Sequence, residues 1–243
     1  MTDGKYIRRF RHAFFDLRVL LLLMMMIGIH GAAASSDRAV DPLSLYGERH
    51  EFSVHRDGVP VGKHMVSFER VGDAYRVDSE LNIEVKFLGI SLYRFDYESE
   101  AIWSEGKLTA IDIRINDDGT NSKIRGMRHV AAFVVNGEVH ATTSHPEVYP
   151  TNHWHKGVLD QSRLFNTLTG KMNNVTITDT GEETVPVRGG TVRATRYVYD
   201  GELTLMSWYD RKGRWVKMAF KAEDNSDMVY FCETCPVEVG LNE

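Results

Sequence analysis

The chain has 243 residues with 29 Lys or Arg, 34 Asp or Glu and a formal net charge of −5. The first 34 residues hold five of the basic and two of the acidic residues, so the remainder carries 24 basic and 32 acidic side chains. That balance disfavours nucleic acid as a partner, because binding to a phosphate backbone requires clustered Lys and Arg. The length left for folding suits one domain.

Residues 1–34 have the features of a secretory signal peptide. Basic residues precede the apolar run VLLLLMMMIGI, and Ala32, Ala33 and Ala34 follow it as a cleavage motif. The apolar run from Val19 to Ile29 is shorter than the roughly 20 residues that span a bilayer. We therefore expect cleavage and a periplasmic or secreted protein; an uncleaved leader would instead leave an inner-membrane tether.

Residues 35–47 are expected to form a flexible segment, residues 48–236 a single antiparallel β domain, and residues 237–243 a tail. In AYRVDSELNIEVKF, the odd positions from Tyr75 to Phe87 are apolar except Ser79, and the even positions are polar. This alternation is typical of a strand with one buried face. Asx-Gly pairs between such runs predict tight hairpin turns. The predicted strands are 49–56, 61–70, 74–87, 91–104, 108–116, 122–128, 130–135, 139–143, 175–179, 184–187, 192–199, 202–209, 215–222 and 228–232.

One stretch has helical spacing of its apolar residues. This is LDQSRLFNTLT, residues 159–169, which Gly170 follows as a stop signal. Long strands with one apolar face need closure into a barrel or a helix across that face. The sequence therefore predicts an all-β fold with one short helix: a large curved antiparallel sheet, or half-open β-barrel, whose concave face this helix covers or plugs.

Four segments occur in an order that resembles a known bacterial family. They are HEFSVHRDGVPVGKHMVSF, HWHKGVLDQSRLFNTLTGK, YDGELTLMSWYDRKGRWVKMAF and YFCETCP. Over residues 48–236 the chain resembles the exported family called domain of unknown function 6134 (DUF6134). The resemblance implies an all-β exported protein and no assigned activity or site residues. More remotely, the hairpin order resembles periplasmic lipoprotein-carrier half-barrels, whose hollow accepts lipid or another apolar group.

Aromatic residues at inward positions form the candidate ligand-binding set. Packing in an ordinary core is the simpler interpretation, because aromatic residues dominate protein cores. The alternative is the lining of an apolar cavity on the concave face, as in typical ligand sites. The candidate residues are Tyr75, Phe87, Tyr93, Phe95, Tyr97, Trp103 and Trp154.

The two cysteines, Cys232 and Cys235, are predicted to form a structural disulfide. An exported chain meets an oxidising compartment, where neighbouring cysteines pair readily. Free thiols and a metal site are the alternatives, since the C-x-x-C spacing is half of a zinc ribbon and His153 and His155 could supply imidazole ligands. We expect these histidines to make local hydrogen bonds, with no metal and no cofactor.

No catalytic motif stands out in the sequence. It contains neither G-x-S-x-G nor H-E-x-x-H, and its carboxylates alternate with apolar residues as on a solvated sheet face. We therefore expect a non-enzymatic cell-envelope protein that binds a lipid, another hydrophobic ligand or a partner's segment on the concave face. The alternatives are a metal-binding protein or hydrolase-like enzyme built on His153, His155, Cys232 and Cys235, and a structural envelope assembly factor with a protein partner.

Overall fold

The computed structural model describes residues 40–130, 132–142 and 147–237. The expected signal peptide and residues 238–243 of the expected tail lie outside these ranges. Within them, no helix is both long enough and apolar enough to cross a membrane.

One short α-helix, one 3-10 helix and fourteen strands make up the regular structure of the described chain. Helix α1 (Pro42–Tyr46) comes first, and Asp41 caps it by accepting hydrogen bonds from the amides of Leu43 and Ser44. The strands are β1 (Arg49–Arg56), β2 (Val59–Val71), β3 (Ala74–Phe87), β4 (Ile90–Ser104), β5 (Lys107–Asp117), β6 (Thr120–Arg128), β7 (Ala132–Val135), β8 (Glu138–Thr142), β9 (Arg163–Phe165), β10 (Met172–Val187), β11 (Gly190–Gly201), β12 (Leu205–Asp210), β13 (Trp215–Lys221) and β14 (Asp227–Cys232).

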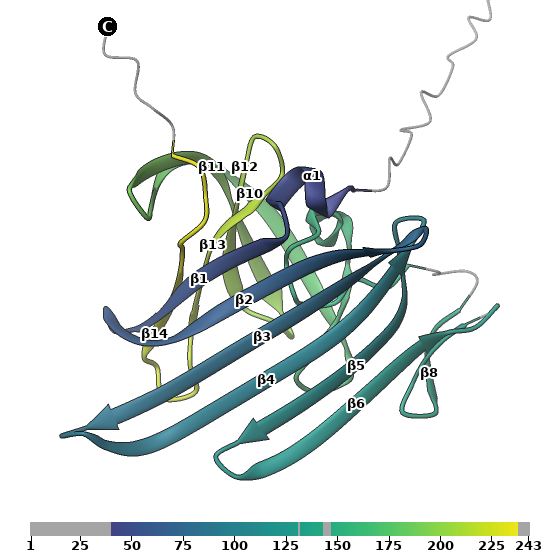
Figure 1. Cartoon of the computed structure of the whole chain (residues 1–243), viewed down its shortest axis with the longest axis horizontal. Helices are drawn as coiled ribbons and strands as arrows, with labels where there is room; N and C mark the ends of the chain where they lie inside the picture. The colour runs from purple at the N-terminus through teal and green to yellow at the C-terminus, as the bar shows by residue number, and fades with distance from the viewer. Residues whose placement is uncertain (1–39, 131, 143–146, 238–243) are drawn as a thin grey trace, which may run out of the picture. The chain divides into compact units, whose positions relative to one another are not determined.

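All fourteen strands belong to one open sheet with antiparallel pairing between neighbours. The order is β8-β7-β6-β5-β4-β3-β2-β1-β14-β13-β12-β11-β10-β9, so β1 lies between β2 and the last strand, β14. The sheet therefore has two halves that meet at the β1–β14 seam and end at β8 and β9. Figure 1 shows the broad curved half built by β1 to β6 and the second half behind it.

Alternating side chains place the core on the concave face. Along β5, Ile111, Ile113 and Ile115 are buried, whereas the intervening Asp112 and Arg114 are not. The Asx-Gly pair Asp57–Gly58 adopts positive φ angles of 48° and 80° in the β1–β2 turn. The prediction of an all-β, curved antiparallel sheet with one short helix is confirmed.

The position of the helix was predicted wrongly. Residues 159–169 form the end of the 3-10 helix η1 (Lys156–Asp160), strand β9 and a turn. The Phe165 amide donates to the Tyr149 carbonyl at 2.9 Å, and the Thr151 amide donates to the Phe165 carbonyl at 3.0 Å. These bonds, together with the pairing of β9 with β10, provide partners for the backbone amide and carbonyl groups in an extended conformation. The segment is therefore extended although the spacing of its apolar residues is helical.

Several strand ends differ by a few residues from the sequence prediction, and two segments differ more clearly. The expected strands 175–179 and 184–187 are one strand, β10, with a register shift between Asp179 and Glu182. The segment 35–47, expected to be flexible, contains α1, whose Tyr46 hydroxyl donates to the Trp154 carbonyl at 2.6 Å. The same hydroxyl accepts from the Trp215 amide at 3.0 Å, so this tyrosine attaches α1 to the β domain.

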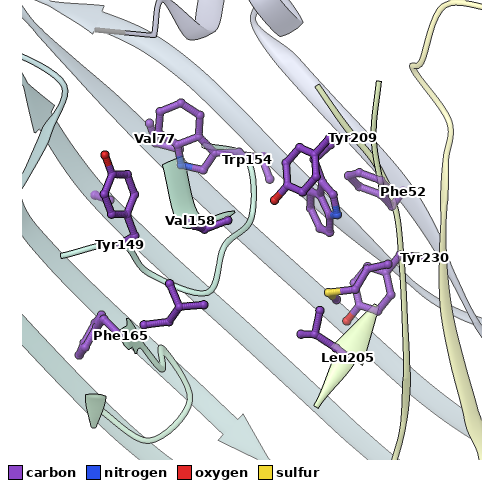
Figure 2. Packing of buried hydrophobic residues seen from close by; sticks show 14 of the residues in the cluster. Phe52, Val77, Tyr149, Trp154, Val158, Phe165, Leu205, Tyr209 and Tyr230 are labelled. Carbon is purple, nitrogen blue, oxygen red and sulfur yellow. The ribbon is translucent and has the colours of Figure 1, made fainter. Parts of the chain in front are cut away.

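Residues 147–170, which we call the plug segment, fill the space between the two halves of the sheet. The Trp154 ring centroid lies 5.1 Å from that of Trp103 on β4 and 5.4 Å from that of Phe68 on β2. From the other half, the Tyr209 hydroxyl of β12 donates to the His153 carbonyl at 2.8 Å. Figure 2 shows Trp154 and Val158 of this segment among the buried residues of the sheet.

Candidate functional site

An apolar cavity of about 180 Å³ lies where the plug segment meets both halves of the sheet. Its deep walls are the buried side chains of His64, His153, Trp215 and Tyr230. The exposed Leu168 and the half-buried Leu81, Leu203 and Phe220 also line the cavity. None of the lining residues carries a carboxylate, an ammonium or a guanidinium group.

His64 brings an imidazole into the apolar face of β2. Its Nε2 lies 2.8 Å from the Ser79 hydroxyl of β3, whereas its Nδ1 has no hydrogen-bond partner among the described residues. Burial lowers the pKa of this imidazole to about 3, with smaller effects from His50 and His153 nearby. At neutral pH the ring is therefore uncharged and retains one unpaired polar nitrogen.

His153 supplies a second neutral imidazole from the plug segment. Its backbone has φ = 58°, an uncommon conformation for a residue other than glycine, and the Trp154 amide donates to the Asn152 carbonyl at 2.8 Å in the same turn. Burial lowers its pKa to about 4, and its Nδ1 also lacks a hydrogen-bond partner within the described ranges. Unpaired buried nitrogens of this kind are costly, and both of these belong to rings that line the cavity.

Several other polar groups near the plug segment are paired with one another, whereas the Nε1 atoms of Trp103 and Trp154 also lack a partner within the described residues. The Tyr97 hydroxyl donates to Asn152 Oδ1 at 3.1 Å, and Asn152 Nδ2 donates to the Ser99 hydroxyl at 3.3 Å. The Thr167 amide donates to the Thr151 hydroxyl at 3.2 Å. Besides the two imidazoles, the cavity wall carries the polar side chains of Asn166, Thr204 and Tyr230.

The predicted aromatic set is divided among three places. Tyr97 lines the cavity. Tyr75, Trp103 and Trp154 line a second pocket of about 290 Å³, whose walls include the charged residues Asp41, Arg70, Asp73 and Glu105 and therefore do not suit an apolar ligand. Phe95 is half-buried against the core, and Phe87 and Tyr93 are exposed, because β3 and β4 continue beyond the enclosed part of the sheet.

The cysteines and histidines do not assemble into the alternative metal set. The Sγ atoms of Cys232 and Cys235 lie 2.02 Å apart, at the distance of the predicted disulfide. His155 Nδ1 accepts from the Gly157 amide at 3.0 Å, and its ring stacks on Trp103. The potential ligand atoms that cluster within 4.8 Å of one another in the described chain belong to His50, Cys232 and Cys235, and the disulfide removes both thiolates from that group.

His50 and His64 were not recognised from the sequence as residues of interest. In β2 the side chains of His64, Val66 and Phe68 share the buried face, so the strand alternation already placed one imidazole among apolar residues. His50 is fully paired, since Nε2 donates to the Trp215 carbonyl at 2.6 Å and Nδ1 lies 3.0 Å from the Thr234 hydroxyl. His50 is therefore a structural residue, whereas His64 and His153 face the cavity.

Comparisons with known proteins support the fold and assign the family. A search of curated proteins found no match. A solved structure described as a beta-barrel-like protein of domain of unknown function DUF1849 from Brucella abortus is similar, with a TM-score of 0.52 and 11% sequence identity over 78% of this chain and 97% of that chain. At that identity the likeness shows the fold alone. The family model described as Domain of unknown function (DUF6134) matches residues 52–233, and this chain therefore belongs to that family.

Proposed function

We propose that this chain is an exported, non-enzymatic protein that binds an uncharged, largely apolar ligand in the cavity beside the plug segment. The observation that carries the proposal is an apolar cavity of about 180 Å³ with two buried neutral imidazoles, each with an unpaired Nδ1 among the described residues. A site of this kind combines apolar walls with a few polar groups that set orientation.

The size and charge of the cavity define the ligand class. Its volume is close to that of an engineered apolar cavity of about 150 Å³ that binds benzene, so it accepts a small ring or one end of an aliphatic chain. A charged group would enter without a counter-charge, which is costly in an apolar site. With a small rotation of the buried ring, a hydroxyl or carbonyl group would instead pair with Nδ1 of His64 or His153 and would make the ligand polar at one point only.

Export forms the second part of the proposal. A basic, then apolar leader with an Ala32–Ala34 exit directs a chain through the secretory pathway. The Cys232–Cys235 pair at bonding distance suits an oxidising compartment such as the periplasm. We therefore infer that the ligand is encountered in the cell envelope or outside the cell, with lipid components as the nearest apolar source.

Calorimetric titration with nonan-1-ol tests ligand binding. Leu81→Trp adds a bulky ring to a lining position of β3, and Glu80→Trp places the same ring on the exposed opposite face of that strand as the matched control. We expect the parent chain and Glu80→Trp to bind the alcohol and Leu81→Trp to lose at least tenfold in affinity. Equal affinity in all three proteins would contradict binding in this cavity.

A further inference from the structure

The tip of the β3–β4 hairpin projects beyond its neighbours in the sheet. The last residue pair between β2 and β3 is Gly62 with Ile83, and the last pair between β4 and β5 is Phe95 with Asp117. Residues 84–94, which we call the β3–β4 arm, therefore form a two-stranded ribbon with no paired strand on either side. In Figure 1 this hairpin reaches past the neighbouring turns.

The end of the arm is apolar and exposed to solvent. The exposed fractions are 64% for Phe87, 86% for Leu88, 66% for Ile90 and 62% for Leu92. Single exposed apolar residues are ordinary on a protein surface, but a contiguous group marks an interaction site. Four large apolar side chains within six residues at the end of a projecting ribbon form such a group.

The turn of the arm keeps a leucine in a conformation that disfavours it. Leu88 has φ = 50° and Gly89 has φ = 81°, both in the left-handed region. Other hairpins of the described chain place a polar residue at the equivalent position before glycine, and Asn and Asp tolerate this φ far better than leucine. These residues, all with positive φ, are Asp57, Glu105, Asp118 and Asn136. The exposed Leu88 thus occupies a backbone conformation that disfavours leucine, and such local strain is typical of functional sites.

The charges next to the apolar tip are positive. Residues 85–95 contain Lys86 and Arg94 and no Asp or Glu, although acidic residues outnumber basic ones in the whole chain. Lys86 pairs with Glu84 at 2.7 Å and Arg94 with Asp96 at 2.8 Å, so the matching acids lie farther from the tip. Apolar side chains followed by long cationic ones suit a bilayer interface, where the cations reach anionic headgroups.

We propose that the β3–β4 arm is a membrane-contact element. Phe87, Leu88, Ile90 and Leu92 enter the outer part of the acyl region of a lipid surface, and Lys86 and Arg94 lie at the headgroups. A protein partner is the rival occupant, but the charged residues nearest the tip are the cations Lys86 and Arg94, and residues 85–95 contain no Asp or Glu, which favours an anionic lipid surface. The inference does not depend on ligand binding in the cavity.

Co-sedimentation with vesicles of phosphatidylcholine and phosphatidylglycerol tests the proposal. The variant Leu88→Asn with Ile90→Thr removes apolar surface from the tip and gives the turn its preferred Asn-Gly pair. We expect its vesicle binding to fall about tenfold or more, while its thermal stability stays equal to that of the parent chain or rises. Val59→Thr changes a residue with 61% exposure in the β1–β2 hairpin and should bind vesicles as the parent chain does.

Two further measurements distinguish lipid contact through the arm from lipid binding in the cavity and from contact between copies of the chain. Replacing Lys86 and Arg94 with glutamine should weaken vesicle binding at low salt and reduce its salt dependence. Leu81→Trp, which fills the cavity, should leave vesicle binding unchanged. Failure of the parent chain to bind vesicles, or equal binding by the Leu88→Asn/Ile90→Thr variant, would overturn the proposal. A lipid-free dimer that this same variant abolishes would also overturn it and would assign the arm to contact between copies of the chain.

Discussion

Three of the four buried histidines in the described chain differ in how their imidazole nitrogens are paired. Burial lowers the pKa values of His50, His64 and His153 to about 4, about 3 and about 4, below the ordinary value of 6.5. His50 has partners for both nitrogens, and its neutral ring joins Thr234 to Trp215. His64 and His153 are buried as well, but the Nδ1 atom of each lacks a partner in the described structure, and both rings line the cavity.

The lowered pKa values predict a loss of stability in mild acid. Between about pH 6.5 and pH 4, the unfolded chain binds protons at these histidines that the folded chain does not bind, so the free energy of unfolding falls as the pH falls. Each site contributes at most about 1.4 kcal/mol per pH unit in that window. Urea titrations from pH 7.5 to pH 4.5 measure the slope. His64→Phe should reduce this slope by the contribution of about one bound proton. A free energy of unfolding that does not change with pH in this range would contradict the lowered pKa values.

His64→Phe also predicts a change in ligand selectivity. Phenylalanine keeps a ring at this position of β2 but removes the unpaired Nδ1 and the bond to Ser79. If His64 recognises the polar end of the ligand, the affinity for nonan-1-ol should fall about fivefold to tenfold relative to that for nonane. Titrations of both ligands against both proteins give the ratio. An unchanged ratio would show that His64 is part of the wall and makes no specific contact.

At the scale of elements, alternation predicted the strands but could not predict where each strand loses its neighbours. The bounds of β3, residues 74–87, follow directly from the alternation of its side chains. Phe87 shares the inward alternation of Val77, yet Phe87 is exposed because the pairing of β2 with β3 ends at Ile83. Residues 159–169 were misassigned because tertiary hydrogen bonds around Phe165 decide their conformation. The cavity arises from contacts between segments distant in sequence, so the local pattern identified Tyr97 but missed Trp215, Phe220 and Tyr230 of its aromatic lining.

The plug segment is expected to be the element on which the stability of the core depends most. Trp154 is 2% exposed and contacts Phe68 and Trp103 from two strands of one half. Trp154→Ala should lower the free energy of unfolding by about 3–5 kcal/mol, because it leaves a large void between the plug and the sheet. Leu168→Ala, in the exposed part of the same segment, should cost about 1 kcal/mol or less. Urea denaturation measures the free energy of unfolding of both variants. A similar small decrease in both would contradict the structural importance of Trp154.

At the scale of the whole molecule, the β1–β14 seam joins the two ends of the described domain. β1 pairs with both β2 and β14, and the Glu51 amide donates to the Thr234 hydroxyl at 3.1 Å beside the disulfide. The seam brings together residues nearly two hundred positions apart, and non-local pairing of this kind favours slow folding. The disulfide follows β14 directly and fixes the chain where the seam ends.

Reduction of the disulfide should have a measurable but limited effect. Cys232 and Cys235 are separated by three positions, and closing so short a loop restricts the unfolded chain by only about 2 kcal/mol. Urea denaturation with and without reductant should show a loss of about that size. The variant Cys232→Ser with Cys235→Ser should be insensitive to reductant, whereas complete unfolding of the parent chain on reduction would show that the seam depends on the disulfide.

Native mass spectrometry on the chain after incubation with a lipid extract of a bacterial envelope tests the proposed function most directly. Binding in the cavity predicts an added mass from an uncharged apolar molecule, present with the parent chain and Glu80→Trp and lost with Leu81→Trp. A parent chain that carries no added mass under gentle ionisation, or an adduct that persists in Leu81→Trp, would contradict the account.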